Sequence, residues 1–201
     1  MAKYIWLLIF LGTLVWSGIE PKDGFTWFLE VAPAIIGLGL IIATYRSFRL
    51  TPLLYWLILA HAAVLMVGGH YTYAEVPFFD DLFGATRNNY DKVGHFFQGF
   101  VPAVLAREIF IRKNVVNGTG WRTLFVVSIC LAFSAFYELI EWGVAEASGV
   151  GADAFLGTQG YVWDTQSDML LALIGAVCAL VALGKLHDAQ LKSLMVEKLT
   201  R

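Results

Sequence analysis

The sequence predicts an all-α protein, a polytopic transmembrane helix bundle of about six spans that forms a single integral membrane domain over residues 1–201. Composition is the first observation: 58% of residues are apolar and only 15% are charged, whereas soluble domains carry about 25% charged residues. Mean hydropathy is +0.66. The second observation is that the apolar residues fall into separate segments near the roughly 20 residues that cross a bilayer. The net charge of −2 argues against a nucleic-acid partner.

The first three predicted spans are residues 4–19, 26–45 and 52–70. The first is short and follows Lys3, so it resembles the start of a secretory signal peptide. No small-x-small cleavage pattern follows Trp16, and we therefore expect an uncleaved span.

The last three predicted spans are residues 92–111, 122–146 and 165–186. The fourth and fifth contain charged residues, so their ends are the least sharply defined. No connection between spans is long enough to hold a soluble domain. The tail from Lys185 alternates charged and apolar residues, which favours a surface helix.

The distribution of Lys and Arg predicts the orientation, because cytoplasmic loops of membrane proteins are enriched in these residues. With six spans, both termini and the second and fourth loops share one side, and ten Lys and Arg residues lie there. The opposite side holds three, Lys22, Arg87 and Lys92. Both termini are therefore expected in the cytoplasm.

Ionisable residues inside the predicted spans are the main functional signal, since each costs about 2.5–3.5 kcal/mol on insertion scales. Several helices bring them to the same external end, often with the i, i+3 or i, i+4 spacing that shares a helix face. Randomly placed polar residues would scatter in depth. The residues in question are His70, Asp91, His95, Glu138, Glu141, Asp164 and Asp168.

Their chemistry suits a hard divalent cation, since carboxylate oxygen and imidazole nitrogen bind Mg, Mn or Zn. The candidate metal ligands are Asp91, His95, Asp164, Asp168 and His70. The candidate acid–base groups are Glu138, Glu141 and His95. The candidate substrate-binding cations are Lys92 and Arg87, which would hold an anionic envelope lipid or lipid-linked substrate. A proton or cation relay is a further use of the same groups.

Structural explanations stand beside each of these roles. Asp91 and Asp164 suit the starts of helices, where a carboxylate favours the positive terminus or caps it. Glu138 and Glu141 suit an ion network with Arg107 or Lys92. His61, in the middle of a span, suits a hydrogen-bonded core histidine.

The sequence also leaves two other functions open. One is a small proton- or ion-coupled transporter whose path would use His61, Arg107 and Glu108. The other is a non-catalytic membrane subunit whose polar cluster locks the helices together. The sequence contains no Ser/His/Asp triad, Cys nucleophile, phosphate loop or dinucleotide fingerprint.

Three motifs resemble the YjdF-like bacterial inner membrane proteins: Tyr-Asp-Lys-Val-Gly-His-Phe-Phe-Gln-Gly-Phe at 90–100, Phe-Tyr-Glu-Leu-Ile-Glu-Trp at 136–142 and Gly-Tyr-Val-Trp-Asp-Thr-Gln-Ser-Asp-Met at 160–169. The resemblance covers nearly the whole chain and implies a location in the bacterial inner membrane, but it implies no mechanism. A looser similarity links the chain to VanZ-like membrane proteins, in which the second motif is Glu-x-x-Gln where this chain has Glu138-x-x-Glu141. The matched positions are Asp91, Lys92, His95, Glu138, Glu141, Asp164 and Asp168.

Overall fold

The computed structural model describes residues 2–79, 88–148 and 162–199. Within those ranges the chain forms six helices and no strand, which confirms the predicted all-α class. Four of the helices, α2, α3, α5 and α6, are long and apolar enough to cross a membrane. The helices are α1 (Ala2–Ser17), α2 (Gly24–Thr44), α3 (Pro52–His70), α4 (Tyr90–Lys113), α5 (Thr119–Ser148) and α6 (Asp164–Leu199).

Helix α4 is less apolar than the four candidate spans, and it packs against protein on several sides. It packs against α3, α5 and α6, and its polar residues His95 and Glu108 are buried. Ionisable side chains at membrane depth normally face the interior of a bundle in this way. Helix α1 is apolar but short, and it packs against α3.

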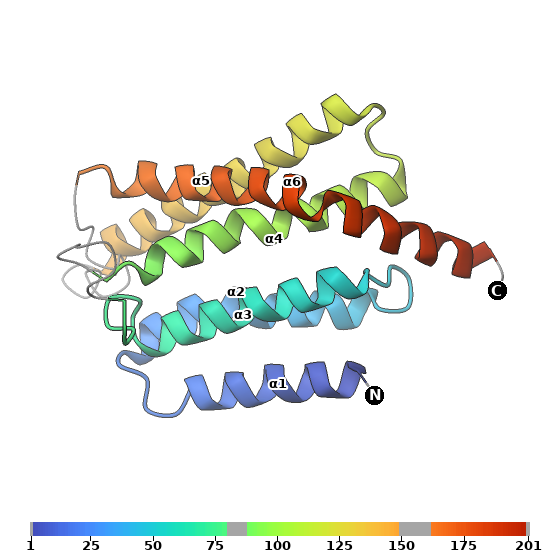
Figure 1. The fold of residues 1–201 in the computed structure, drawn as a ribbon. Coiled ribbons are helices and arrows are strands. Elements are labelled where there is room, and N and C mark those ends of the chain that lie inside the picture. The colour runs from blue at the N-terminus through green and yellow to red at the C-terminus, as the bar shows by residue number, and fades with distance from the viewer. Residues whose placement is uncertain (1, 80–87, 149–161, 200–201) are drawn as a thin grey trace.

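The helices form two groups that meet where α3 packs on α4 (Figure 1). Helices α1 and α2 pack on α3, and their core contains Phe10, Val31 and Met66. Helices α5 and α6 pack on α4, and their core contains Val104 and Ala176. The start of α1 and the end of α6 lie at the same end of the bundle.

Glycines allow α4 and α6 to approach backbone to backbone. A methyl group at Gly99 would overlap the carbonyl of Ala172, and one at Gly175 would overlap the carbonyl of Phe96. Small residues at such contacts are typical of helix pairs in membranes. Since α4 and α6 run in the same direction (Figure 1), His95 and Asp168, each four residues before one member of the Gly99–Ala172 contact, also lie close together.

Local sequence signals explain where several helices begin and end. Asp23 caps α2, because its side chain accepts a hydrogen bond of 2.7 Å from the backbone N–H of Thr26. Helix α3 starts with the Thr51 cap and Pro52 in the first turn. Helix α4 ends where Asn114 adopts a left-handed conformation with φ of 53°.

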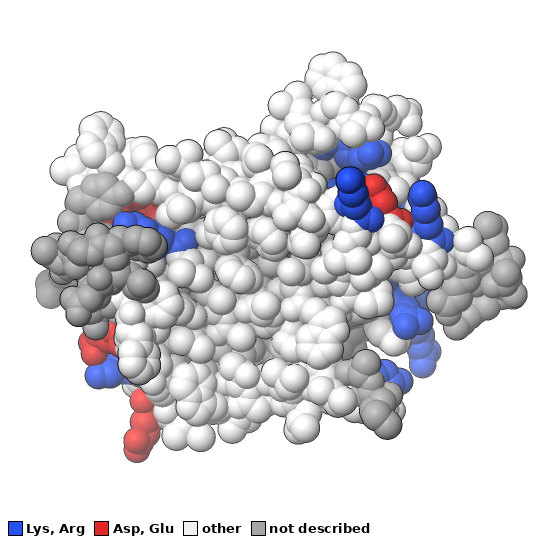
Figure 2. Space-filling view, viewed as in Figure 1, with Lys and Arg blue, Asp and Glu red and all other residues white. Residues whose placement is uncertain are grey.

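Charged residues gather at the two ends of the bundle and leave a broad uncharged band between them (Figure 2). Lys and Arg dominate the end where α1 begins and α6 ends. Large apolar side chains such as Leu8, Ile36, Leu139 and Val181 are exposed on the helices. An exposed apolar band flanked by charge is the surface that a bilayer requires.

Candidate metal centre

The buried imidazole of His95 lies between carboxylates from three helices. Its Nε2 atom is 3.3 Å from Asp91 Oδ1, one turn earlier on α4, and 4.0 Å from Asp168 Oδ2 on α6. Its Nδ1 atom is 3.8 Å from Glu138 Oε1 on α5. The histidine therefore has negative charge on both sides of its ring.

These residues and Glu141 form two overlapping groups, and within each group the ligand atoms lie within 4.8 Å of one another. The first group is Asp91, His95 and Asp168, and the second is His95, Glu138 and Glu141. Each group combines two carboxylates with one imidazole, a donor set that suits Mg, Mn or Zn. The structure thus brings together five of the residues that the sequence singled out.

Two carboxylate oxygens in the cluster are buried without a hydrogen-bond donor, Glu138 Oε1 and Asp168 Oδ1. Glu138 is 9% exposed and Asp168 is 4% exposed. A buried polar atom without a partner costs about 1–3 kcal/mol, and a charged one costs more. Four carboxylates also share a single imidazole, so the cluster combines strong like-charge repulsion with unused ligand atoms. A divalent cation would remove both costs.

A neighbouring glutamine orients the histidine. Gln98 Oε1 lies 3.1 Å from His95 Nδ1, and because an amide oxygen can only accept, Nδ1 carries a proton. The other ring nitrogen, Nε2, faces Asp91 and Asp168, and it can bind a cation there once it has no proton. Histidines that bind metals usually donate their other N–H in this way. The geometry therefore favours the group formed by Asp91, His95 and Asp168 as the metal-binding group.

Among the described residues of the group formed by Asp91, His95 and Asp168, Asp91 is the most exposed. The side chain of Asp91 is 25% exposed, while those of His95 and Asp168 are 7% and 5% exposed. Glu141 is half-buried. Small ions and polar groups would thus approach past Asp91, from the end of the bundle opposite the one rich in Lys and Arg.

The other two predicted ligands, Asp164 and His70, belong to neither group. Asp164 is buried in the first turn of α6. His70, the last residue of α3, turns toward α1, where its Nδ1 is 3.0 Å from the carbonyl oxygen of Ser17. Because that oxygen only accepts, His70 donates to an otherwise unpaired carbonyl at the end of α1. The position of α1 against α3 thus directs His70 away from the cluster.

One of the two predicted substrate-binding cations, Lys92, lies in the first turn of α4. Lys92 is the third residue of α4 and follows Asp91, and its ammonium group donates to Asn89 Oδ1 at 2.8 Å. Arg87 lies outside the described residues.

Glu30 and Tyr137 extend the polar region toward α2, which the sequence did not predict. The Tyr137 hydroxyl donates to Glu30 Oε2 at 3.2 Å. Glu30 is 5% exposed. Tyr137 precedes Glu138 in the second motif, but its partner is 107 residues away, so sequence spacing gave no sign of the pair.

A second polar network lies at the opposite end of the bundle. The carboxylate of Glu108 accepts hydrogen bonds from Thr51, Arg112 and His187 at 2.6–3.3 Å. Arg107 donates to His187 Nδ1 at 3.0 Å and pairs with Asp188 at 2.7 Å. Arg107 is thus engaged far from Glu138 and Glu141. Since the atoms of Glu108 are well supplied with donors, this network has the character of a structural link between α3, α4 and α6.

The helices and the buried cluster define a class: an all-helical membrane protein with histidine and carboxylates gathered inside one end of the bundle. The chain belongs to the family described as "Predicted membrane protein (DUF2238)", whose model matches residues 2–189. It is 53% identical over 182 residues to "Inner membrane protein YjdF" of Escherichia coli (strain K12), covering 89% of this chain and 87% of that protein. No solved structure matches. The resemblance to YjdF-like proteins is confirmed, and the similarity to VanZ-like proteins stays a prediction.

Proposed function

We propose that this protein binds a divalent cation through Asp91, His95 and Asp168, and that the loaded site holds or acts on an anionic component of the bacterial envelope. The observation that carries the proposal is the pair of buried carboxylate oxygens without donors, Glu138 Oε1 and Asp168 Oδ1, beside an imidazole whose Nε2 faces two carboxylates. Such a cluster is expensive to bury unless a cation joins it.

The site is expected on the periplasmic side of the inner membrane, with both termini in the cytoplasm. The bias in Lys and Arg supports this orientation. The printed name of the relative YjdF, an inner membrane protein, supports the location. Under this orientation, Asp91 faces the periplasm and gives access to envelope components.

A bound divalent cation would polarise a phosphate or carbonyl oxygen and neutralise charge that develops on it. The residues of the chain have separate roles around it. Asp91, His95 and Asp168 supply the ligand atoms, and Gln98 holds the imidazole ring in place. Glu138 and Glu141 lie on the other side of His95. Their proposed role is to accept a proton from a bound substrate or to donate one to it.

Recognition of an anionic head group would fall to Lys92, which neighbours Asp91 at the start of α4. Arg87 is proposed for the same role from its place in the sequence. A cationic side chain next to a metal site suits an anionic lipid or a lipid-linked phosphate.

The test is metal-dependent stabilisation of the detergent-purified protein after chelation. Adding Mn²⁺, Mg²⁺ or Zn²⁺ should raise the midpoint of thermal unfolding, and a cation at 100 times its Kd contributes about 2.7 kcal/mol. Asp91→Asn and Asp168→Asn should lose the shift. Glu146→Gln should keep it, because Glu146 is an exposed residue of α5 outside the cluster. An equal shift in all four proteins would refute the proposed site.

A second measurement separates metal binding from the envelope substrate. Binding of glycerol 3-phosphate, a soluble anionic head group without acyl chains, should depend on Mn²⁺ in the wild type and should be weakened by Lys92→Gln. If metal stabilises the protein but does not change glycerol 3-phosphate binding, the cation site is supported and the envelope ligand is rejected. If no metal binds and Asp168→Asn is merely less stable, the cluster is a structural ion network and the protein is better regarded as a non-catalytic subunit.

A further inference from the structure

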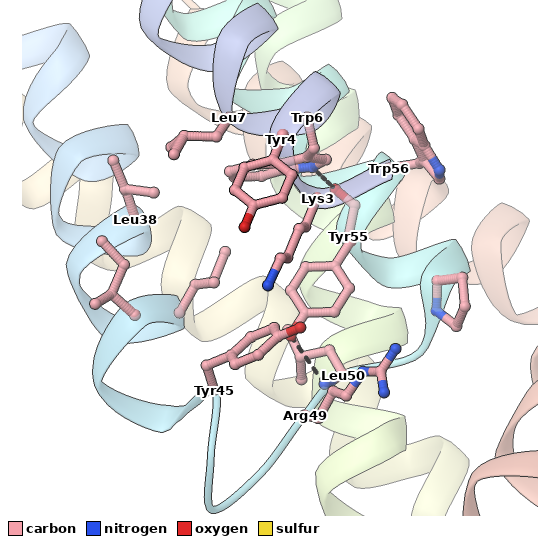
Figure 3. Close-up of a pocket in the computed structure, with 13 residues that line it drawn as sticks. Lys3, Tyr4, Trp6, Leu7, Leu38, Tyr45, Arg49, Leu50, Tyr55 and Trp56 are labelled. Carbon is pink, nitrogen blue, oxygen red and sulfur yellow. Dashed lines mark hydrogen bonds between the residues drawn. The ribbon is translucent and has the colours of Figure 1, made fainter. Parts of the chain in front are cut away.

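A pocket of about 400 Å³ lies between α1, α2 and α3 (Figure 3). It is lined by the start of α1 and the end of α2, which lie at the end of the bundle opposite the metal centre (Figure 1). Its lining is mostly apolar and aromatic, with two cations. The residues that matter for its chemistry are Lys3, Trp6, Leu38, Tyr45, Arg49 and Tyr55.

The pocket exists because α1 and α2 both pack on α3 and make little contact with one another. The floor is held by hydrogen bonds around Tyr55. The indole N–H of Trp6 donates to the Tyr55 carbonyl at 2.7 Å, and the Tyr55 hydroxyl accepts from the backbone N–H of Leu50 at 3.3 Å. A groove with a fixed floor and two helical walls can keep its shape without a ligand.

Positive charge is concentrated at one end of this groove. Lys3 and Arg49 both line it, and none of its lining residues is an Asp or Glu. Figure 3 shows the Lys3 side chain running along the pocket toward Tyr45 and Arg49. The Lys3 ammonium also lies 5.0 Å from the centre of the Tyr4 ring. The head of the groove thus attracts an anion, while its walls attract hydrocarbon.

We propose that this pocket binds an anionic phospholipid from the cytoplasmic leaflet, with the phosphate near Lys3 and Arg49 and one acyl chain along α1 and α2. Basic pockets between helices on the cytoplasmic side commonly bind such head groups. The lining Ile42 and Trp56 are 65% and 47% exposed, so the groove opens sideways to the bilayer. A volume of about 400 Å³ falls in the range of roughly 300–1,000 Å³ that ligand pockets occupy.

The proposal is independent of the metal centre, and the experiment keeps the two apart. The full chain is purified in detergent with chelator present, and its thermal unfolding is followed while phosphatidylglycerol, phosphatidylcholine or inorganic phosphate is added. Phosphatidylglycerol should raise the midpoint, and the other two should raise it much less. Equal stabilisation by phosphatidylcholine would show that the pocket does not select an anionic head group. Equal stabilisation by inorganic phosphate would show that the acyl chain contributes nothing to binding.

Substitutions test whether the pocket is responsible. Lys3→Gln combined with Arg49→Gln should weaken phosphatidylglycerol binding by at least tenfold, and Leu38→Trp should block the acyl chain while leaving both cations. Arg46→Gln is the matched control, because Arg46 is in the same connection between α2 and α3 but does not line the pocket. If Arg46→Gln weakens binding as much as the double variant, or if Leu38→Trp has no effect, the lipid is not bound in this pocket.

Discussion

His95 and Gln98 are one turn apart on α4, and the 3.1 Å contact between His95 Nδ1 and Gln98 Oε1 leaves Nε2 as the ring nitrogen that faces Asp91 and Asp168. Because Nδ1 donates to Gln98, a cation between Asp91 and Asp168 would bind the ring through Nε2. A neutral side chain thus controls the histidine, although nothing about Gln98 stands out in the sequence.

Replacing Gln98 should therefore weaken metal binding without removing a ligand. Replacing a residue that hydrogen-bonds to a metal-binding histidine typically lowers metal affinity by about 10–100-fold, and we expect a loss in this range for Gln98→Leu. Isothermal titration with Mn²⁺ measures it. Gln166→Leu, an exposed position on α6, should leave affinity unchanged. A full-strength site in Gln98→Leu would show that the imidazole is oriented by other contacts.

The close contact of α4 with α6 predicts opposite effects for two glycines of the same helix. Gly175→Ala should destabilise the protein by about 1–3 kcal/mol, because the added methyl group has no room beside Phe96. Gly184→Ala should be neutral or stabilise by up to about 1 kcal/mol, since nothing lies within 4 Å of the added carbon. Unfolding in detergent by chemical denaturant compares them. A stable Gly175→Ala protein would contradict the observed helix separation.

The Glu108 network predicts a large structural effect remote from the metal. Glu108→Leu should cost about 3–5 kcal/mol, because it leaves Arg112, His187 and Thr51 without their buried acceptor. Asp188→Asn should cost at most about 1 kcal/mol, since the Asp188 side chain in its pair with Arg107 is 51% exposed. Equal losses in the two variants would mean that burial does not determine the strength of this network.

The Asp23 cap predicts a dependence of stability on pH. The hydrogen bond from the backbone N–H of Thr26 lowers the pKa of the Asp23 carboxyl below its usual value of 3.8. The folded state thus favours the ionised form, so this contribution is fully present above that value and is lost as the pH falls through the lowered pKa.

Two substitutions of Asp23 separate the effect of its negative charge on stability from the effect of its capping hydrogen bond. Asp23→Ala should cost about 1 kcal/mol at neutral pH, and Asp23→Asn should cost less because its side-chain oxygen can still accept. The stability difference between wild type and Asp23→Asn should shrink as the pH is lowered toward about 3. A difference that stays constant over this range would show that the charge of Asp23 contributes nothing.

The helices could be predicted from the sequence because an apolar run near the width of a bilayer has few alternatives to a helix. The convergence of Asp91, His95, Glu138, Glu141 and Asp168 also had a local signal, namely pairs spaced three or four residues apart at one predicted depth. Depth does not fix rotation about the helix axis, however. His70 lies at the expected end but faces Ser17 on α1.

The spacing of residues in the sequence could not predict contacts between residues that are far apart in the chain. His187 was expected in a surface tail, yet it is 1% exposed and donates to Glu108, 79 residues away. The signal for such a contact is the packing of α6 along α4, which depends on Gly99 and Gly175 rather than on any charged motif. The same holds for Glu30, whose partner Tyr137 is brought near by the arrangement of α2 and α5 around the centre.

The most direct test of the central claim is the metal content of the purified protein, measured by mass spectrometry for wild type, Asp168→Asn and Asp188→Asn. Both substitutions remove one carboxylate charge from α6, but only Asp168 faces His95. If the metal centre exists, wild type and Asp188→Asn should each contain about one divalent cation per chain. The metal content of Asp168→Asn should be far lower, because its affinity for the cation should fall by at least tenfold. The same content in all three proteins, or none in the wild type after incubation with Mn²⁺, Mg²⁺ and Zn²⁺, would contradict the proposed metal centre.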